Sequence, residues 1–189
     1  MIDDSVWNRL LRERAEHPLA FVDALRGRRR RSLLPADNRL LIVAADHTAR
    51  AILAAGAEPF AIANRRELLD RLTRALANPL VDGVLASADI IEELAWLVAL
   101  EEKVVFGTMN RGGYLGATWG LDDLVTAYDA EHVASLGLDG GKVLLRIEHT
   151  DPGVLRTLDD VVNQMRLLAE RDLVCIVEPL PYEIGRAHV

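Results

Sequence analysis

Short apolar runs that alternate with amphipathic stretches are the feature of this sequence that most restricts its fold. The first run, Leu-Leu-Ile-Val-Ala-Ala at residues 40–45, is continuous, which is typical of a strand buried on both faces. Similar runs follow at 81–86, 103–107, 142–147 and 173–177. Between them, apolar residues recur at helical spacing. The pattern predicts an α/β fold in which five parallel strands are joined by four crossover helices.

The predicted helices carry start and stop signals of their own. One helix follows Asn64, with Glu67 three residues later as in a capping box. A helix near residues 122–136 ends at Gly137, which suits a left-handed cap. Thr157 begins a further helix with capping-box spacing. These signals predict where the crossover segments begin and end.

A parallel sheet of this kind closes in one of two ways, as an open doubly wound sheet or as a (β/α)₈ barrel. A complete barrel needs roughly 250 residues, so five strand–helix units would be about the first five-eighths of one. The pattern alone does not choose between them. No Gly-x-Gly-x-x-Gly or Walker sequence follows a predicted strand, which disfavours a nucleotide-binding open sheet.

The chain divides into three parts. Residues 1–39 are expected to form an N-terminal helical extension, and residues 40–182 hold the strand–helix units. Residues 183–189, Glu-Ile-Gly-Arg-Ala-His-Val, read as the translation of a common sequencing adapter. We therefore expect a non-native tail on a fragment whose native reading ends near Tyr182.

Charge and composition exclude several classes of protein. The 22 basic and 29 acidic residues give a net charge of −7, which argues against a nucleic-acid-coating protein. The basic run at 28–31 is accordingly expected to be a solvated helix end rather than an anion-binding patch. No apolar run reaches the roughly 18 residues of a membrane span. With the single Cys175, no internal disulfide is possible. We expect a cytoplasmic protein with no nucleic-acid or membrane partner.

Polar side chains lie at the carboxyl ends of the predicted strands, where parallel α/β folds carry their chemistry. Asp46 follows the first strand, Arg146 lies at the end of the fourth and Glu178 at the end of the fifth. Asp46 and Glu178 are candidate proton-transfer groups, because apolar surroundings shift a carboxyl group toward neutrality. Arg146 is a candidate for holding a substrate oxyanion. The same three residues could instead form a structural ion-pair network.

Four more residues near the strand ends are candidate substrate contacts: His47, Asn110, Arg111 and Glu148. Two of them, Asn110 and Arg111, begin a stretch rich in glycine, with glycines at 107, 112, 113, 116 and 120. Such a stretch is either a mobile loop over a substrate or a set of tight turns.

Several of these stretches also resemble a known family. Residues 41–47, an alanine-rich run that ends in Asp-His, resemble the first strand of the TIM-barrel class I aldolases. Residues 107–113, 128–131, 137–142 and 177–181 resemble a narrower aldolase-like (β/α)₈ group, related to deoxyribose-phosphate and tagatose-bisphosphate aldolases and often encoded beside inositol-catabolism genes. The resemblance spans about residues 40–182. It implies an incomplete (β/α)₈ TIM barrel, with strands one to five parallel, helices outside and N-terminal helices added.

The resemblance further implies cleavage of a carbon–carbon bond through a Schiff base, without cofactor or metal, on a phosphorylated sugar or sugar acid. Deoxy-keto-gluconate phosphate is the expected substrate, and the full-length protein is expected to be a homo-oligomer. The Schiff-base lysine belongs to a sixth strand, which lies beyond this chain. Lys103 and Lys142, the two lysines here, both begin predicted strands, at the wrong end of a barrel. We therefore expect the fragment itself to be inactive.

Two other functions remain open. The first is a metal-dependent lyase or isomerase, with carboxylate and imidazole ligands from Asp46, His47, Glu148, His149 and Glu178. The second is a non-enzymatic regulatory or interaction protein on an open α/β sheet, with the arginine run as its partner surface.

Overall fold

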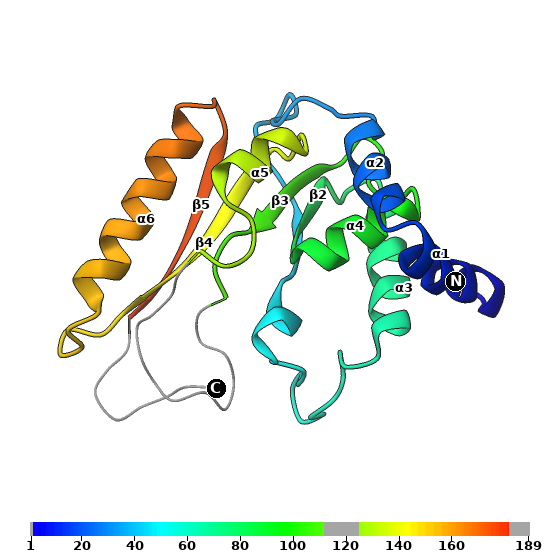
Figure 1. Cartoon of the computed structure of the whole chain (residues 1–189), viewed down its shortest axis with the longest axis horizontal. Coiled ribbons are helices and arrows are strands. Elements are labelled where there is room, and N and C mark those ends of the chain that lie inside the picture. Colours follow the sequence, from blue (N-terminus) through cyan, green and yellow to red (C-terminus); the bar gives the residue numbers. More distant parts are fainter. Residues whose placement is uncertain (1, 112–124, 182–189) are drawn as a thin grey trace.

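The computed structural model describes residues 2–111 and 125–181 of the chain (Figure 1). The glycines at 112, 113, 116 and 120, and the predicted tail at 183–189, lie outside the described residues. The helices are α1 (Asp4–Glu16), α2 (Leu19–Gly27), α3 (Arg65–Leu76), α4 (Ala88–Trp96), α5 (Ala130–Ser135) and α6 (Val154–Ala169), with a short 3₁₀ helix η1 (His47–Arg50). The strands are β1 (Ile42–Ala45), β2 (Gly83–Ala86), β3 (Val104–Thr108), β4 (Gly140–Ile147) and β5 (Val174–Pro181).

The five strands form one parallel sheet in the order β1-β2-β3-β4-β5. This confirms the predicted α/β fold, because each crossover helix returns the chain to the same sheet beside the preceding strand. The sheet curls into a half-barrel, and α3 to α6 lie on its outer side (Figure 1). An order of 2-1-3-4-5, which an open doubly wound sheet would show, is not the one observed.

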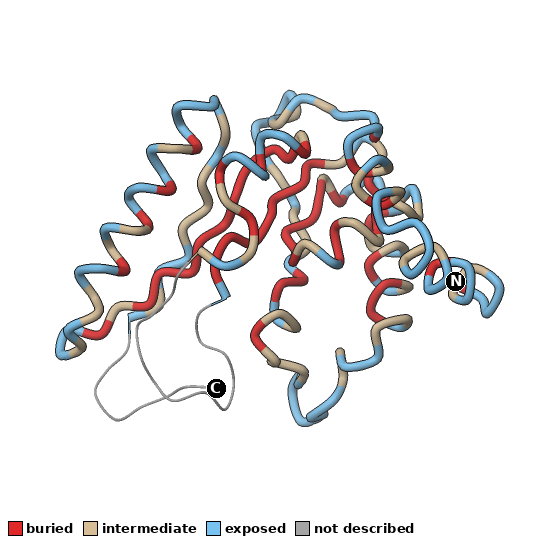
Figure 2. Tube along the Cα trace, viewed as in Figure 1, coloured by how far each residue is buried: buried red, intermediate tan, exposed pale blue. Residues whose placement is uncertain are grey.

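The two faces of the sheet have different cores. The outer face contributes Val43, Val84, Val105, Val143 and Leu145 to the main hydrophobic cluster, together with the apolar stripes of the helices. A smaller cluster on the inner face is built from Leu85, Val104 and Phe106. Buried segments follow β2, β3 and β4 and the sheet-facing sides of the helices, whereas β1 and β5 are only partly buried (Figure 2). Alternation along each strand therefore separates a helix-covered face from a concave face.

Helix boundaries follow the capping signals in part. The Asn64 side chain accepts a hydrogen bond from the Glu67 N–H, and Gly137 takes a φ of +66°, both as predicted. By contrast, α5 begins only after Asp129, whose carboxylate caps the His132 N–H. Thr157 was expected to begin a helix and is instead buried inside α6.

The arginine run after α2 contacts the amino ends of the strands, which corrects the expectation of a solvated helix end in part, since Arg29 and Arg30 are exposed and Arg28 is buried. Arg28 is buried and donates to the Leu25 carbonyl at 3.3 Å and to the Gly137 carbonyl at 2.8 Å. Arg28 and Arg30 both contact Asp139, which directly precedes β4, at 3.3 and 3.0 Å. Arg31 contacts Asp82 at 2.9 Å in the same way before β2, and Arg29 contacts Glu101 at 2.8 Å. The N-terminal extension thus closes the amino-end side of the half-barrel.

Within the described residues, no helix combines the length and the apolar character that crossing a membrane requires.

Candidate functional site

Strand register places three polar side chains in one row on the concave face. Ala45, Ala86, Gly107 and Gly141 lie side by side in the sheet. The next residues of β1, β3 and β4 are Asp46, Thr108 and Lys142, which therefore share the opposite, inner face. Their side chains meet in space although 96 residues separate the first from the last. This row is the centre of the candidate site.

Asp46 is the most contacted residue of the row and is 3% exposed. Its Oδ2 accepts hydrogen bonds from Arg50 Nη1 at 2.7 Å, Lys142 Nζ at 2.8 Å and Thr108 Oγ1 at 3.0 Å. The other oxygen, Oδ1, lies 3.9 Å from His47 Nδ1. Two cations and a hydroxyl thus converge on one carboxylate oxygen.

These contacts overturn the expectation that Asp46 is shifted toward neutrality. Burial raises the pKa of Asp46, but the Lys142 hydrogen bond and the charges of Lys142 and Arg50 together outweigh it and lower the pKa to about 2. The apolar strands alone would raise this pKa, but the fold also brings the cations of Lys142 and Arg50 to the carboxylate. At neutral pH the carboxyl group is ionised.

Lys142 lies in the site, which corrects the prediction that it sits at the wrong end of a barrel. It is 4% exposed, and its Nζ contacts Asp46 Oδ2 at 2.8 Å and Glu178 Oε2 at 2.5 Å. The physical reason is the stagger of neighbouring strands, which a curled parallel sheet requires. The first residue of β4, Gly140, pairs with Phe106 in the middle of β3, so Lys142 pairs with Thr108 at the end of β3.

Glu178 completes the charged cluster from β5. It pairs in register with Leu144 and contacts Lys142 from one row further along the strands. Its side chain is 49% exposed, so the expected apolar enclosure of this carboxyl group is wrong. The structure brings Asp46 and Glu178 together through the Lys142 ammonium, and leaves Glu178 accessible to a ligand. We call Asp46, Arg50, Lys142 and Glu178 the Lys142 cluster.

Arg50 is a member of this cluster that the sequence analysis missed. Besides Asp46 Oδ2, its guanidinium contacts the Asp46 carbonyl at 3.3 Å and the Asn110 carbonyl at 3.0 Å. The available signal was its spacing four residues after Asp46, which places two residues on one side of a helical turn.

Asn110 has a partner on the neighbouring strand. Its amide nitrogen donates to the Leu144 carbonyl at 2.8 Å, and its amide oxygen accepts from the Leu144 N–H at 2.8 Å. The side chain thus extends the pairing of β3 with β4 beyond the end of β3. A substrate contact by Asn110 stays a prediction.

The remaining predicted residues lie around the cluster. Arg146 is buried and pairs in register with Leu180, one row beyond Glu178. Glu148 accepts hydrogen bonds from the N–H and hydroxyl of Thr150. His47 is half exposed, and Arg111 is exposed with its Nε 3.3 Å from Thr126 Oγ1. Their roles as substrate contacts stay predictions.

Among the described residues, no three His, Cys, Asp or Glu side chains gather in a group that could hold a metal ion. Asp46 and Glu178, two of the carboxylates considered as ligands, instead share the Lys142 ammonium.

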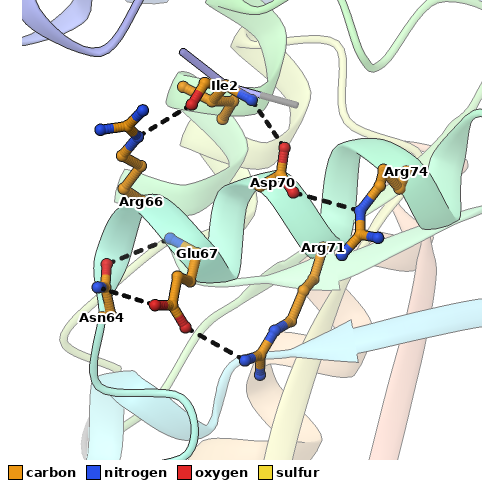
Figure 3. Close-up of a pocket in the computed structure, with 7 residues that line it drawn as sticks. All are labelled: Ile2, Asn64, Arg66, Glu67, Asp70, Arg71 and Arg74. Carbon is orange, nitrogen blue, oxygen red and sulfur yellow. Dashed lines mark hydrogen bonds and ion pairs between the residues drawn. The ribbon is translucent and has the colours of Figure 1, made fainter. Parts of the chain in front are cut away.

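A cavity of about 430 Å³ lies elsewhere, beside α3 and the N-terminus (Figure 3). Its arginines contact neighbouring carboxylates and carbonyls: Arg66 reaches the Ile2 carbonyl at 2.9 Å, Arg71 reaches Glu67 at 3.2 Å and Arg74 reaches Asp70 at 3.2 Å. None of the predicted site residues lines this cavity. We assign it no ligand.

The fold and the site together define an α/β half-barrel protein with a buried, charged cluster on the concave face of its parallel sheet. The chain belongs to the Cgl0159-like family, whose model matches residues 38–189. The crystal structure of Cgl0159 from Corynebacterium glutamicum is similar, with 40% sequence identity and a TM-score of 0.92 over 98% of this chain and 64% of that chain. This chain therefore spans less than two thirds of the length of that protein. No curated protein matches the chain.

This family assignment corrects the resemblance to the TIM-barrel class I aldolases. The matched family is the Cgl0159-like one, and the short motifs on which the resemblance depended do not establish kinship with the aldolases. Such motifs sit at strand ends, where unrelated parallel α/β proteins also carry polar residues and glycines.

Proposed function

We propose that this chain is part of a carbon–carbon lyase that cleaves a phosphorylated sugar or sugar acid by an aldol-type reaction. The proposal concerns the reaction and does not depend on kinship with known aldolases. The observation that carries it is the Lys142 ammonium, held between Asp46 at 2.8 Å and Glu178 at 2.5 Å on the concave face. Two carboxylates in unlike surroundings beside one cation are suited to proton transfer on a polar substrate.

Aldol cleavage makes chemical demands that this cluster fits. The hydroxyl on the carbon β to the carbonyl loses its proton as the carbon–carbon bond breaks, and the electron pair moves to the carbonyl side. Glu178, half exposed and so accessible, is the proposed acceptor of that proton. Lys142 offers a fixed positive charge to the oxygen that gains charge, and Asp46 holds Lys142 in place.

Covalent catalysis through a Schiff base is part of the proposal. A lysine amine condenses with the substrate carbonyl and releases water, so that the electron pair of the broken bond moves into a protonated imine. The proposal assigns this amine to a lysine on a sixth strand, outside the described residues. Lys142 is not assigned this role because its nitrogen is engaged with two carboxylates.

The proposal extends to the architecture of the whole protein. The half-barrel would be the first five units of a (β/α)₈ barrel. Three observations support this: the strand order, the stagger of β3 against β4, and the longer chain of Cgl0159. The whole protein would be a cytoplasmic homo-oligomer that uses no metal or cofactor. Its partner would be the small phosphorylated substrate, with no nucleic-acid or membrane partner.

A substrate panel with a matched pair of variants tests the reaction. Phosphorylated ketoses and sugar acids are added to the protein that contains this chain, and aldehyde release is followed through a coupled dehydrogenase. Glu178→Gln is expected to lower kcat by ~10²–10⁴-fold, as removal of a proton-transfer group does. Glu170→Gln, an exposed carboxylate at the end of α6, is the control and is expected to leave kcat unchanged.

Borohydride trapping tests the Schiff base separately. With substrate present, reduction is expected to leave a stable adduct on a lysine other than Lys103 and Lys142, the two lysines of this chain. Absence of aldehyde release across the panel would refute the proposal. A Glu178→Gln variant with full turnover and a lowered Tm would instead refute the role of Glu178 as proton acceptor, because Glu178 would then be structural.

A further inference from the structure

Arg50 is buried beside Asp46, a position that neither the proposed reaction nor the pairing of the strands accounts for. It ends η1, the single turn that follows Asp46, and Ala51 behind it takes a left-handed φ of +58°. The Ala51 N–H bonds back to the carbonyls of His47 and Thr48, which closes the turn and returns Arg50 toward β1. The result is a buried guanidinium beside Asp46 rather than an exposed one at the rim.

The guanidinium joins two segments that are distant in sequence. It donates to Asp46 Oδ2 at 2.7 Å and, through its other terminal nitrogen, to the Asn110 carbonyl at 3.0 Å. Asn110 is in turn bound to the Leu144 main chain of β4. Arg50 therefore ties the end of β1 to the β3–β4 pair on which Lys142 lies.

We infer that Arg50 is the positioning residue of this site. It fixes Asp46 as an anion, and Asp46 in turn holds Lys142 beside Glu178. Asp46 itself takes no part in proton transfer. The inference rests on the proposed function for its effect on turnover, but its effect on Asp46 stands apart from any reaction. The proton that moves during the proposed reaction is thereby assigned to the Lys142–Glu178 side of the cluster.

The groups that face Asp46 support a fixed charge. From η1 come Arg50 and the more distant His47, from β3 the neutral hydroxyl of Thr108, and from β4 Lys142. Glu178 on β5 faces Asp46 only across Lys142. With two cations on one oxygen, the pKa of Asp46 falls to about 2, so a catalytic cycle near neutral pH has no access to its protonated form.

The test compares Arg50→Met and Arg50→Gln, which remove the charge, with Arg50→Lys, which keeps it. Arg71→Met is the matched control, because Arg71 also pairs with a carboxylate four residues earlier but on the surface. The protonation of Asp46 is followed in the 189-residue chain by ¹³C NMR of labelled aspartate carboxyl groups between pH 3 and 6, assigned with Asp46→Asn. Loss of a neighbouring charge typically moves a carboxyl pKa by about 1–3 units.

Asp46 is expected to stay ionised over this range in the unchanged chain, in Arg50→Lys and in Arg71→Met. It is expected to titrate within the range in Arg50→Met and Arg50→Gln. In the whole protein, the two neutral variants are expected to lower kcat by ~10²-fold, with KM within about twofold and the acid limb of the pH profile moved upward. Arg50→Lys is expected to restore part of kcat, which a purely packing role would not predict.

An Asp46 that titrates identically in the unchanged chain and in the folded neutral variants would overturn the inference. Where Arg50→Met does not fold, Arg50→Gln decides, because it keeps a hydrogen-bond donor on a shorter, neutral side chain. If the whole protein shows no aldol cleavage but Asp46 titrates as expected, the proposed function is refuted. The conclusion that Asp46 is a fixed anion would then still hold. Turnover that survives in both neutral variants would overturn the positioning role while leaving the proposed function standing.

Discussion

At the scale of single residues, the chemistry of this protein depends on how charges are shared rather than on which residue types are present. Asp46 and Glu178 are both carboxylates of the same cluster, yet one is buried with two cations and the other is half exposed with one. Burial of a charge is tolerated only with such partners, since an isolated ion in the interior costs far more than its contacts return. The difference in surroundings is what separates a fixed anion from a candidate proton acceptor.

The Asp46 charge predicts a dependence of stability on pH. Its folded-state pKa of about 2 lies below the ordinary 3.8, so its contribution is complete above 3.8 and disappears as the pH falls toward 2. The difference corresponds to about 2 kcal/mol of unfolding free energy. Between pH 5 and pH 2, the unfolding free energy of the unchanged chain is therefore expected to fall by about 2 kcal/mol more than that of Asp46→Asn.

Urea unfolding at a series of pH values measures this difference. Asp23→Asn, which changes an exposed carboxylate on α2, serves as the control and is expected to follow the unchanged chain. Parallel curves for Asp46→Asn and the unchanged chain would show that the carboxylate is not held ionised by its cations.

At the scale of elements, the N-terminal extension acts as a closure for the amino ends of the strands. α2 packs on α4 through Phe21, which stacks on Trp96 with ring centroids 5.7 Å apart. Beyond α2, the arginine run contacts Asp82 before β2 and Asp139 before β4. Asp139 also accepts the Val105 N–H at 2.8 Å, so the contact reaches the backbone of β3. Side chains from one short segment thus join the starts of three strands.

Two adjacent arginines test how far this closure depends on burial. Arg28→Met removes a buried guanidinium from the Gly137 carbonyl and Asp139, and is expected to lower the unfolding free energy by about 2 kcal/mol. Arg29→Met removes an exposed guanidinium from Glu101, and is expected to lower the unfolding free energy much less than Arg28→Met does. Chemical denaturation of both variants measures the contrast. Equal effects would mean that the run contributes only through surface charge.

At the scale of the whole molecule, the described half-barrel has two strand edges and one exposed apolar stripe. β1 and β5 each pair with a strand on one side. Beside β5, helix α6 exposes Leu155, Val162 and Met165. Unpaired backbone groups next to exposed apolar side chains favour association with another chain.

We accordingly expect the 189-residue chain to self-associate. Sedimentation velocity from low to high micromolar concentration should show a shift from monomer to dimer or larger species. Val162→Lys with Met165→Lys is expected to reduce the shift, because charges on this stripe oppose its burial. Leu19→Lys, on the exposed face of α2, is the control. A cooperative monomer throughout this range would contradict the expectation.

Much of the fold follows from local pattern. The apolar runs at 81–86, 103–107 and 142–147 predict buried parallel strands, because a strand covered on both faces cannot alternate with polar residues, and β2, β3 and β4 are buried. The runs at 40–45 and 173–177 also predict strands, but β1 and β5 are only partly buried, so the predicted burial on both faces is wrong for these two. The cap at Asn64 is equally local, since the side chain and the N–H that it accepts are three residues apart. The start of α5 was harder to predict, because the apolar residues at 125, 127 and 128 precede the helix and do not belong to it.

The sequence by itself therefore determined the class of fold and the presence of polar residues, Asp46 and Glu178 among them, at the carboxyl ends of the strands. Only the tertiary structure decided which of those residues meet and in which charge state. Lys142 enters the site because β4 is staggered against β3, and stagger is a property of the curled sheet rather than of any one strand. Asp46 is ionised because Arg50 and Lys142 reach the same oxygen. Electrostatic energy depends on distance in space, and for Asp46 and Lys142 the fold alone sets that distance.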